Sequence, residues 1–126
     1  MHIKKTKVAT YGGPLWIVVS KNISRAIDKV EDMIDDSVHM ENKQYRSYTF
    51  ANDNERGRYR VIIFIRPTSS PGEIAHECKH AVNLIFASKG VKLSLSNDEH
   101  ECYFLEQIID VAYRAIKEYN KKYGPK

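Results

Sequence analysis

Two histidines and a glutamate in the second half of the chain, His76, Glu77 and His80, have the spacing His-Glu-x-x-His. Residues four apart project from the same face of an α-helix, so both imidazoles could bind one metal ion without backbone strain. Glu77 would lie one step around that helix, beside the ion and outside its ligand set. Its carboxylate could take a proton from a water whose pKa the ion lowers towards ~7, and later pass that proton to a leaving amine. This pattern is typical of zinc hydrolases.

The segment that carries the two histidines has strong helix signals. Ser70, Pro71 and Glu73 supply an N-cap, a first-turn proline and the glutamate of a capping box. Gly90 can take the left-handed conformation that ends a helix. We therefore predict a helix over about 71–88. The alternative interpretation is that both histidines are ordinary, partly exposed polar residues opposite an apolar face made by Ile74, Cys78, Val82 and Ile85.

A catalytic zinc site commonly has three protein ligands and one water, so a further ligand is needed. The start of the last predicted helix offers a polar cluster, Asp98, Glu99, His100 and Glu101. The apolar residues further along that helix recur at helical spacing and define its inward face: Leu105, Ile109, Ala112 and Ile116. Extended back to the start of the helix, this spacing points Glu101 and Asp98 inward. It places Glu99 on the side of Cys102 and Tyr103. Acidic residues also suit a helix N-terminus as caps, so each carboxylate remains a candidate at this point. We expect His100 to be exposed and Tyr103 to pack, with a hydrogen bond to a reacting oxyanion as the alternative role of Tyr103.

Residues 74–83, followed by Asn97-Asp98-Glu99 and then Tyr103, resemble a group of small phage- and prophage-encoded zinc metallopeptidases of the zincin type. The resemblance is specific over residues 70–112 and loose before them. It implies a zincin-like fold with a small sheet, the metal-bearing helix and a C-terminal helix.

The resemblance also implies roles for individual residues. His76 and His80 would be Zn²⁺ ligands, Glu77 the general base and acid, and Glu99 the third ligand, with Glu101 as the alternative that phasing favours. The implied reaction is hydrolysis of a peptide or other amide bond in a peptide or protein substrate. In zincins an extended substrate can add to a sheet edge beside the cleft, and the strand Arg60–Ile65 is the candidate here.

The rest of the pattern indicates an α+β fold in one domain, residues 1–126. Apolar β-branched residues predict a strand over Leu15–Val19, and three- and four-residue apolar spacing predicts a helix after the cap Asn22. Two strands, Tyr45–Phe50 and Arg58–Ile65, are expected to form a hairpin. With a last helix from the Ser96–Asp98 cluster to about Tyr119, the expected order is β-α-β-β-α-α.

Length and composition bound the class of protein. A chain of 126 residues with 42% hydrophobic and 29% charged residues fits one ordinary globular domain and excludes a large multidomain enzyme or a disordered chain. With no apolar run near the ~20 residues that span a bilayer and no signal-peptide pattern, we expect a cytoplasmic protein, in a bacterial host cell if the resemblance holds. Cys78 and Cys102 are expected to be reduced, buried packing residues.

The net charge of +4 is concentrated at the two ends of the chain. Residues 1–7 carry three lysines and residues 114–126 carry a net +4, which leaves a slightly acidic middle. The sequence contains no recognisable motif for binding in a groove of DNA or RNA, so we do not expect a nucleic-acid partner. The alternative function is a non-enzymatic, zincin-like phage module that binds a host protein or nucleic acid through its basic ends.

Overall fold

The computed structural model describes residues 1–7, 13–34, 46–53, 59–92, 94–96 and 98–124. Its strands form one mixed four-stranded sheet in the order β1-β2-β4-β3. The outer pairs are antiparallel, and the central pair, β2 with β4, is parallel. Along the chain the elements are β1 (His2–Lys7), β2 (Pro14–Val19), α1 (Ile23–Ile34), β3 (Tyr48–Asp53), β4 (Tyr59–Ile65), α2 (Pro71–Ser88) and α3 (Asp98–Tyr123). The fold is a single α+β domain.

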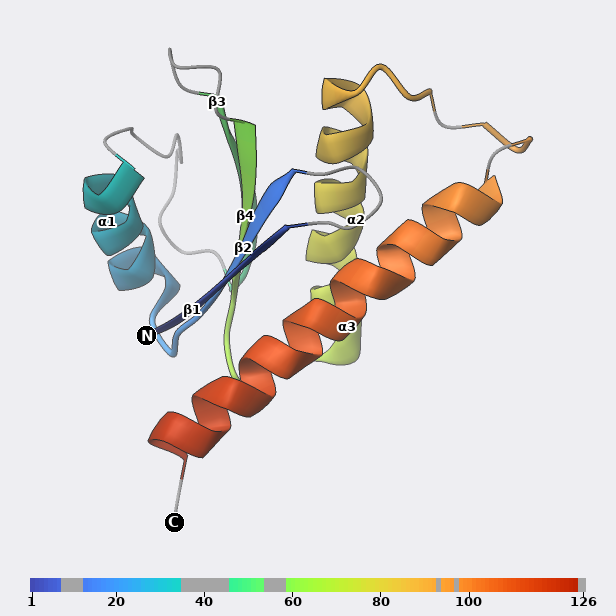
Figure 1. The fold of residues 1–126 in the computed structure, drawn as a ribbon. Coiled ribbons are helices and arrows are strands. Elements are labelled where there is room, and N and C mark those ends of the chain that lie inside the picture. Colours follow the sequence, from blue (N-terminus) through green and yellow to red (C-terminus); the bar gives the residue numbers. More distant parts are fainter. Residues whose placement is uncertain (8–12, 35–45, 54–58, 93, 97, 125–126) are drawn as a thin grey trace.

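The sheet has helices on both faces (Figure 1): α2 and α3 cover one face, and α1 packs on the other. Successive side chains of a strand point to opposite faces. In β2, Ile17 and Val19 therefore pack with α2 and α3, whereas Val18 packs with α1. Burial on both faces explains the continuous apolar runs of β2 and β4.

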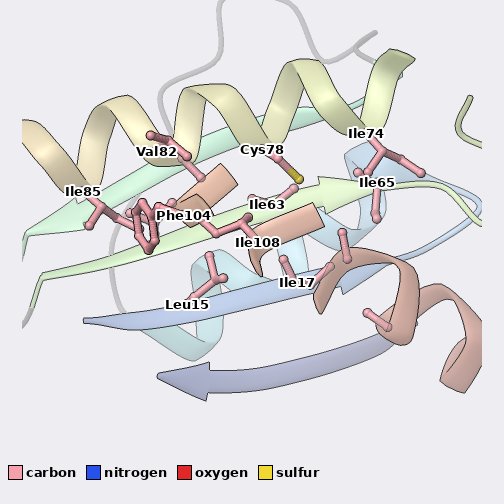
Figure 2. Packing of buried hydrophobic residues seen from close by; sticks show 14 of the residues in the cluster. Leu15, Ile17, Ile63, Ile65, Ile74, Cys78, Val82, Ile85, Phe104 and Ile108 are labelled. Atoms are coloured by element: carbon pink, nitrogen blue, oxygen red, sulfur yellow. The ribbon is translucent and has the colours of Figure 1, made fainter. Parts of the chain in front are cut away.

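The apolar face of α2 is the expected one. Its buried side chains include Ile74, Cys78, Val82 and Ile85, which point towards the sheet and towards Phe104 and Ile108 of α3 (Figure 2). The Phe86 and Phe104 rings stack with their centroids 5.4 Å apart. This packing fixes the rotation of α2, and it leaves His76 and His80 on the exposed side of the helix.

The local rules placed the start of α1 and both ends of α2 correctly. Asn22 Oδ1 accepts a hydrogen bond from the Arg25 backbone N–H at 3.1 Å, and Ser70 Oγ accepts one from the Glu73 N–H at 3.1 Å. α2 ends at Ser88, and Gly90 has φ +70°, as a left-handed terminating glycine requires. α3 continues to Tyr123, four residues beyond the predicted end. The expected antiparallel pairing of β3 with β4 is present, but β3 runs over Tyr48–Asp53 and not over Tyr45–Phe50, and Tyr45 and Arg58 lie outside the described residues.

β1 was missed by the sequence patterns. Its residues, HIKKTK, contain one apolar side chain and were interpreted as part of a basic chain end. The strand forms because its backbone pairs antiparallel with β2. Its side chains also reach α3, where Lys4 Nζ lies 2.7 Å from Glu118 Oε1. Lysines are common on edge strands because they discourage further pairing.

α3 is 26 residues long, but charged residues interrupt it throughout. Within the described part of the chain, none of the helices combines the length and the apolar character needed to cross a bilayer.

Candidate metal centre

α2 brings His76 and His80 together on its exposed face. Their Nε2 atoms are 3.1 Å apart, and the ring centroids are 4.7 Å apart with the ring planes at 82°. This is the juxtaposition that the four-residue spacing predicts. The two imidazoles therefore present their Nε2 atoms to one point in front of the helix.

The distance between the two nitrogens is informative about what they can bind. Two ligands at 2.0–2.1 Å from a tetrahedral Zn²⁺ are separated by about 3.3–3.4 Å, close to the 3.1 Å between these Nε2 atoms. Without an ion, the same distance accommodates a hydrogen bond from a protonated Nε2 to the lone pair of the other ring. A metal ion would take the place of that proton with little movement of either side chain.

Glu77 lies beside the histidines and is nearly inaccessible, with 5% of its surface exposed. Ser47 Oγ donates to Glu77 Oε2 at 2.7 Å, and Thr49 Oγ1 donates to Glu77 Oε1 at 2.7 Å. Thr49 Oγ1 also lies 3.1 Å from the Glu77 main-chain oxygen. Each carboxylate oxygen therefore has a hydroxyl partner from the chain around the start of β3.

Sequence reasoning missed Ser47 and Thr49. They are two positions apart, so they lie on the same side of an extended chain, and in the fold that side faces α2. Two small hydroxyl residues at alternating positions were a visible signal. The sequence did not show that they would face Glu77, because that contact depends on how β3 packs against α2.

The histidines and Glu77 share one hollow of about 460 Å³. It is lined by Ser47, Tyr48, Thr49, His76, Glu77, His80, Asn83 and Leu84. One wall is thus the exposed side of α2, and the other is the start of β3. The candidate site is a shallow groove between a helix and a strand.

The strand that borders this hollow is not the one expected to form the sheet edge. β4, which contains Arg60–Ile65, pairs with β2 on one side and with β3 on the other, so the proposal that this segment is the edge was wrong. β3 is the terminal strand in the sheet order, next to α2. Any strand added beside the hollow would have to pair with β3.

The start of α3 does not complete a set of three metal ligands. Glu101 forms an ion pair with Lys79 of α2, and Glu99 is exposed. Among the residues that the structure describes, no three His, Cys, Asp or Glu side chains are grouped so that they could hold a metal ion. Glu99 would have to approach His76 and His80 to become a ligand.

The phase of α3 differs slightly from the predicted one. Its buried residues are Phe104, Ile108, Ala112, Ala115 and Tyr119. The buried face of the helix therefore begins about one residue earlier than the face predicted from Leu105 and Ile109. Glu101 lies on this inward side, as expected, but Asp98 is exposed. Tyr103 is 62% exposed, so the expectation that it packs was wrong. His100 is exposed, as predicted, and so are Glu99 and Cys102.

The two cysteines have different environments. Cys78 is fully buried on the face of α2 turned away from the hollow, and burial, together with the nearby Glu77 carboxylate, raises the pKa of its thiol to about 12. Cys102 is exposed on α3, so its expected role as a buried packing residue was wrong. Both are free thiols.

No family model, curated protein or solved structure matches this chain. The resemblance to phage zincins remains an expectation from the motif.

Proposed function

We propose that this protein is a zinc-dependent metallopeptidase of the zincin type, similar to the small phage- and prophage-encoded enzymes. The observation that carries the proposal is the pair of His76 and His80 Nε2 atoms, 3.1 Å apart, in one hollow with Glu77. A His-Glu-x-x-His spacing on an irregular segment, or on a buried helix face, would not allow this chemistry. Here both imidazoles are exposed on one regular helix.

The donor set fits Zn²⁺. Imidazole nitrogen is a preferred zinc ligand, and the separation of the two Nε2 atoms is close to that of neighbouring positions around a tetrahedral ion. Each histidine would bind as a neutral ring through Nε2, with its remaining proton on Nδ1. Bound zinc would supply a Lewis acid that polarises an amide carbonyl and lowers the pKa of a water molecule.

Glu77 would carry the proton through the reaction. Its carboxylate takes a proton from the attacking water as the water oxygen bonds to the carbonyl carbon. It then gives this proton to the amide nitrogen as the C–N bond breaks, so that the leaving group departs as a neutral amine. Ser47 and Thr49 hold this side chain in the lining of the hollow that also contains the two histidines.

β3 would guide an extended peptide into the hollow. One side of this strand pairs with β4, and in the sheet order no strand follows it on the other side among the described residues. A strand at the end of a sheet can add an extended segment by main-chain hydrogen bonds. The substrate class is therefore a peptide or an unfolded protein segment that can lie along β3.

Metal removal tests this function. Cleavage of an extended-peptide library by the full chain should disappear after a zinc chelator is added, and it should return with about one equivalent of Zn²⁺. The matched control is the chelator together with excess Zn²⁺ from the start, which should leave cleavage intact. Cleavage that persists in zinc-free protein would contradict a zinc peptidase. Absence of cleavage under every condition would favour the binding module. Joint neutralisation of Lys121 and Lys122 should then weaken the binding of its partner.

For the third ligand we propose Glu99, with Glu101 as the alternative. Glu99→Gln should weaken zinc binding, because an amide oxygen is a poorer ligand than a carboxylate. The loss should exceed about 10–100-fold, which is typical when a residue that only hydrogen-bonds to a metal ligand is removed. Glu101→Gln should have a smaller effect, since its carboxylate is paired with Lys79. Zinc competition against a chromophoric chelator measures both affinities. The reverse order would identify Glu101 as the ligand.

A further inference from the structure

The buried Glu77 carboxylate is bound by two side-chain hydroxyls. Both oxygens accept hydrogen bonds at 2.7 Å, one from Ser47 Oγ and one from Thr49 Oγ1. These distances are ordinary for O–H···O hydrogen bonds and lie at the long end of the range of about 2.5–2.7 Å typical of a charged acceptor. Both donors come from one short stretch of chain at the start of β3.

These hydroxyls are the compensation for burying the carboxylate. Glu77 is 5% exposed, and a buried charge is tolerated only with polar partners. Among residues 1–7, 13–34, 46–53, 59–92, 94–96 and 98–124, no salt bridge reaches Glu77. Within these residues, Ser47 and Thr49 supply hydrogen bonds to the buried carboxylate.

The two hydroxyls also fix the direction of the carboxylate. Thr49 is held in the sheet by its pairing with Ile63 of β4, and its branched side chain has restricted rotation about χ1. Thr49 Oγ1 also lies 3.1 Å from the Glu77 main-chain oxygen, so the hydroxyl contacts the backbone of α2 as well as the carboxylate. A carboxylate oxygen can accept two hydrogen bonds, so each Glu77 oxygen retains the capacity for one further donor.

We propose that Ser47 and Thr49 are positioning residues that hold Glu77 in its productive orientation. This inference rests on the proposed peptidase function. Under this inference, one stretch of chain has two roles. β3 would align the substrate, and Ser47 and Thr49, at the start of this strand, would orient the proton carrier Glu77. Displacement of this stretch of chain would misplace Glu77 relative to any peptide bound along β3.

The test uses an isosteric exchange in the full-length chain. Thr49→Val keeps the shape of the side chain and removes its hydroxyl, and Ser47→Ala removes the other donor. The double variant should lower kcat by about 10–100-fold, with KM changed less than about twofold and zinc content unchanged. Thr49→Ser, which restores a hydroxyl, should keep most of the activity. Thr6→Val, a matched exchange on β1 at the opposite edge of the sheet, should have no effect.

Several outcomes would overturn the proposal. Unchanged kcat in the double variant would show that the hydroxyls are dispensable, and an effect on KM alone would make them substrate contacts. Loss of zinc would assign them to the metal site. A Thr49→Ser variant as inactive as Thr49→Val would indicate a structural role. If the double variant does not fold, the same comparisons are made on Ser47→Ala and Thr49→Val separately.

A second readout is independent of activity, so it still applies if the chain proves not to be a peptidase. Carbon-13 labelling of glutamate side-chain carboxyls gives a signal for Glu77, identified by its absence in Glu77→Gln. This signal should move towards that of the exposed glutamates in the double variant and stay in place in Thr6→Val. An unmoved signal would refute the hydroxyl contacts themselves, whereas a moved signal without any cleavage in the unmodified protein would refute only the peptidase function.

Discussion

Glu77→Gln is expected to lower turnover of any peptide substrate by about 10²–10⁴-fold, the range for losing general acid–base catalysis. Zinc content and thermal stability should stay nearly unchanged. Glutamine has the same shape, and its amide can still bond to the two hydroxyls, since Ser47 and Thr49 can accept as well as donate. The exchange therefore removes the proton carrier and leaves its surroundings in place.

The measurement compares kcat, zinc content and melting temperature of the variant with those of the unmodified chain. Glu106→Gln is the matched control, because Glu106 is an exposed glutamate on α3 and does not line the hollow. It should retain full turnover. Unchanged cleavage by Glu77→Gln would refute the proposed mechanism, and loss of zinc would show that Glu77 is itself a ligand.

His80→Ala is expected to abolish tight zinc binding. The remaining ring nitrogen and one carboxylate would be too few ligands for a stable site, since zinc sites normally have at least three from the protein. Zinc that binds the folded state stabilises it, by about 2.7 kcal/mol at a free concentration 100 times the Kd. The variant should therefore lose the rise in melting temperature that zinc gives to the unmodified protein.

His100→Ala provides the control for this experiment. His100 is also exposed, but it lies in the first turn of α3 and does not line the hollow. This variant should bind zinc and respond to it thermally like the unmodified chain. An equal loss of zinc from both variants would indicate general surface binding by histidines.

Features governed by local rules were predictable from the sequence. The Ser70 cap, Pro71 and Gly90 set the ends of α2, so the relative position of His76 and His80 followed from helix geometry alone. The β3–β4 hairpin was likewise local, since its strands are close in sequence. These predictions needed no knowledge of the rest of the chain.

Features that depend on distant partners were missed or placed incorrectly. β1 is polar in sequence and is a strand because it pairs with β2. The strand order puts β4 at the centre of the sheet and β3 at the end, which no local pattern encodes. The contacts of Ser47 and Thr49 with Glu77 join segments about thirty residues apart and depend on the same order.

The start of α3 shows the same limit. The family motif favours Glu99 and the helical phase favours Glu101, and the choice depends on how the first turn of α3 approaches α2. In the structure Glu101 is paired with Lys79, and Glu99 faces solvent. The spacing alone brings the two histidines together, whereas the choice of the proposed third ligand depends on tertiary packing.

The most direct test is the zinc stoichiometry of the full-length chain, purified without a histidine tag and measured by elemental analysis alongside protein concentration. About one zinc per chain is expected for the unmodified protein and for His100→Ala, and close to none for His76→Ala and His80→Ala. An absence of zinc from the unmodified chain even after incubation with Zn²⁺, or full retention in His80→Ala, would contradict a metal centre on α2.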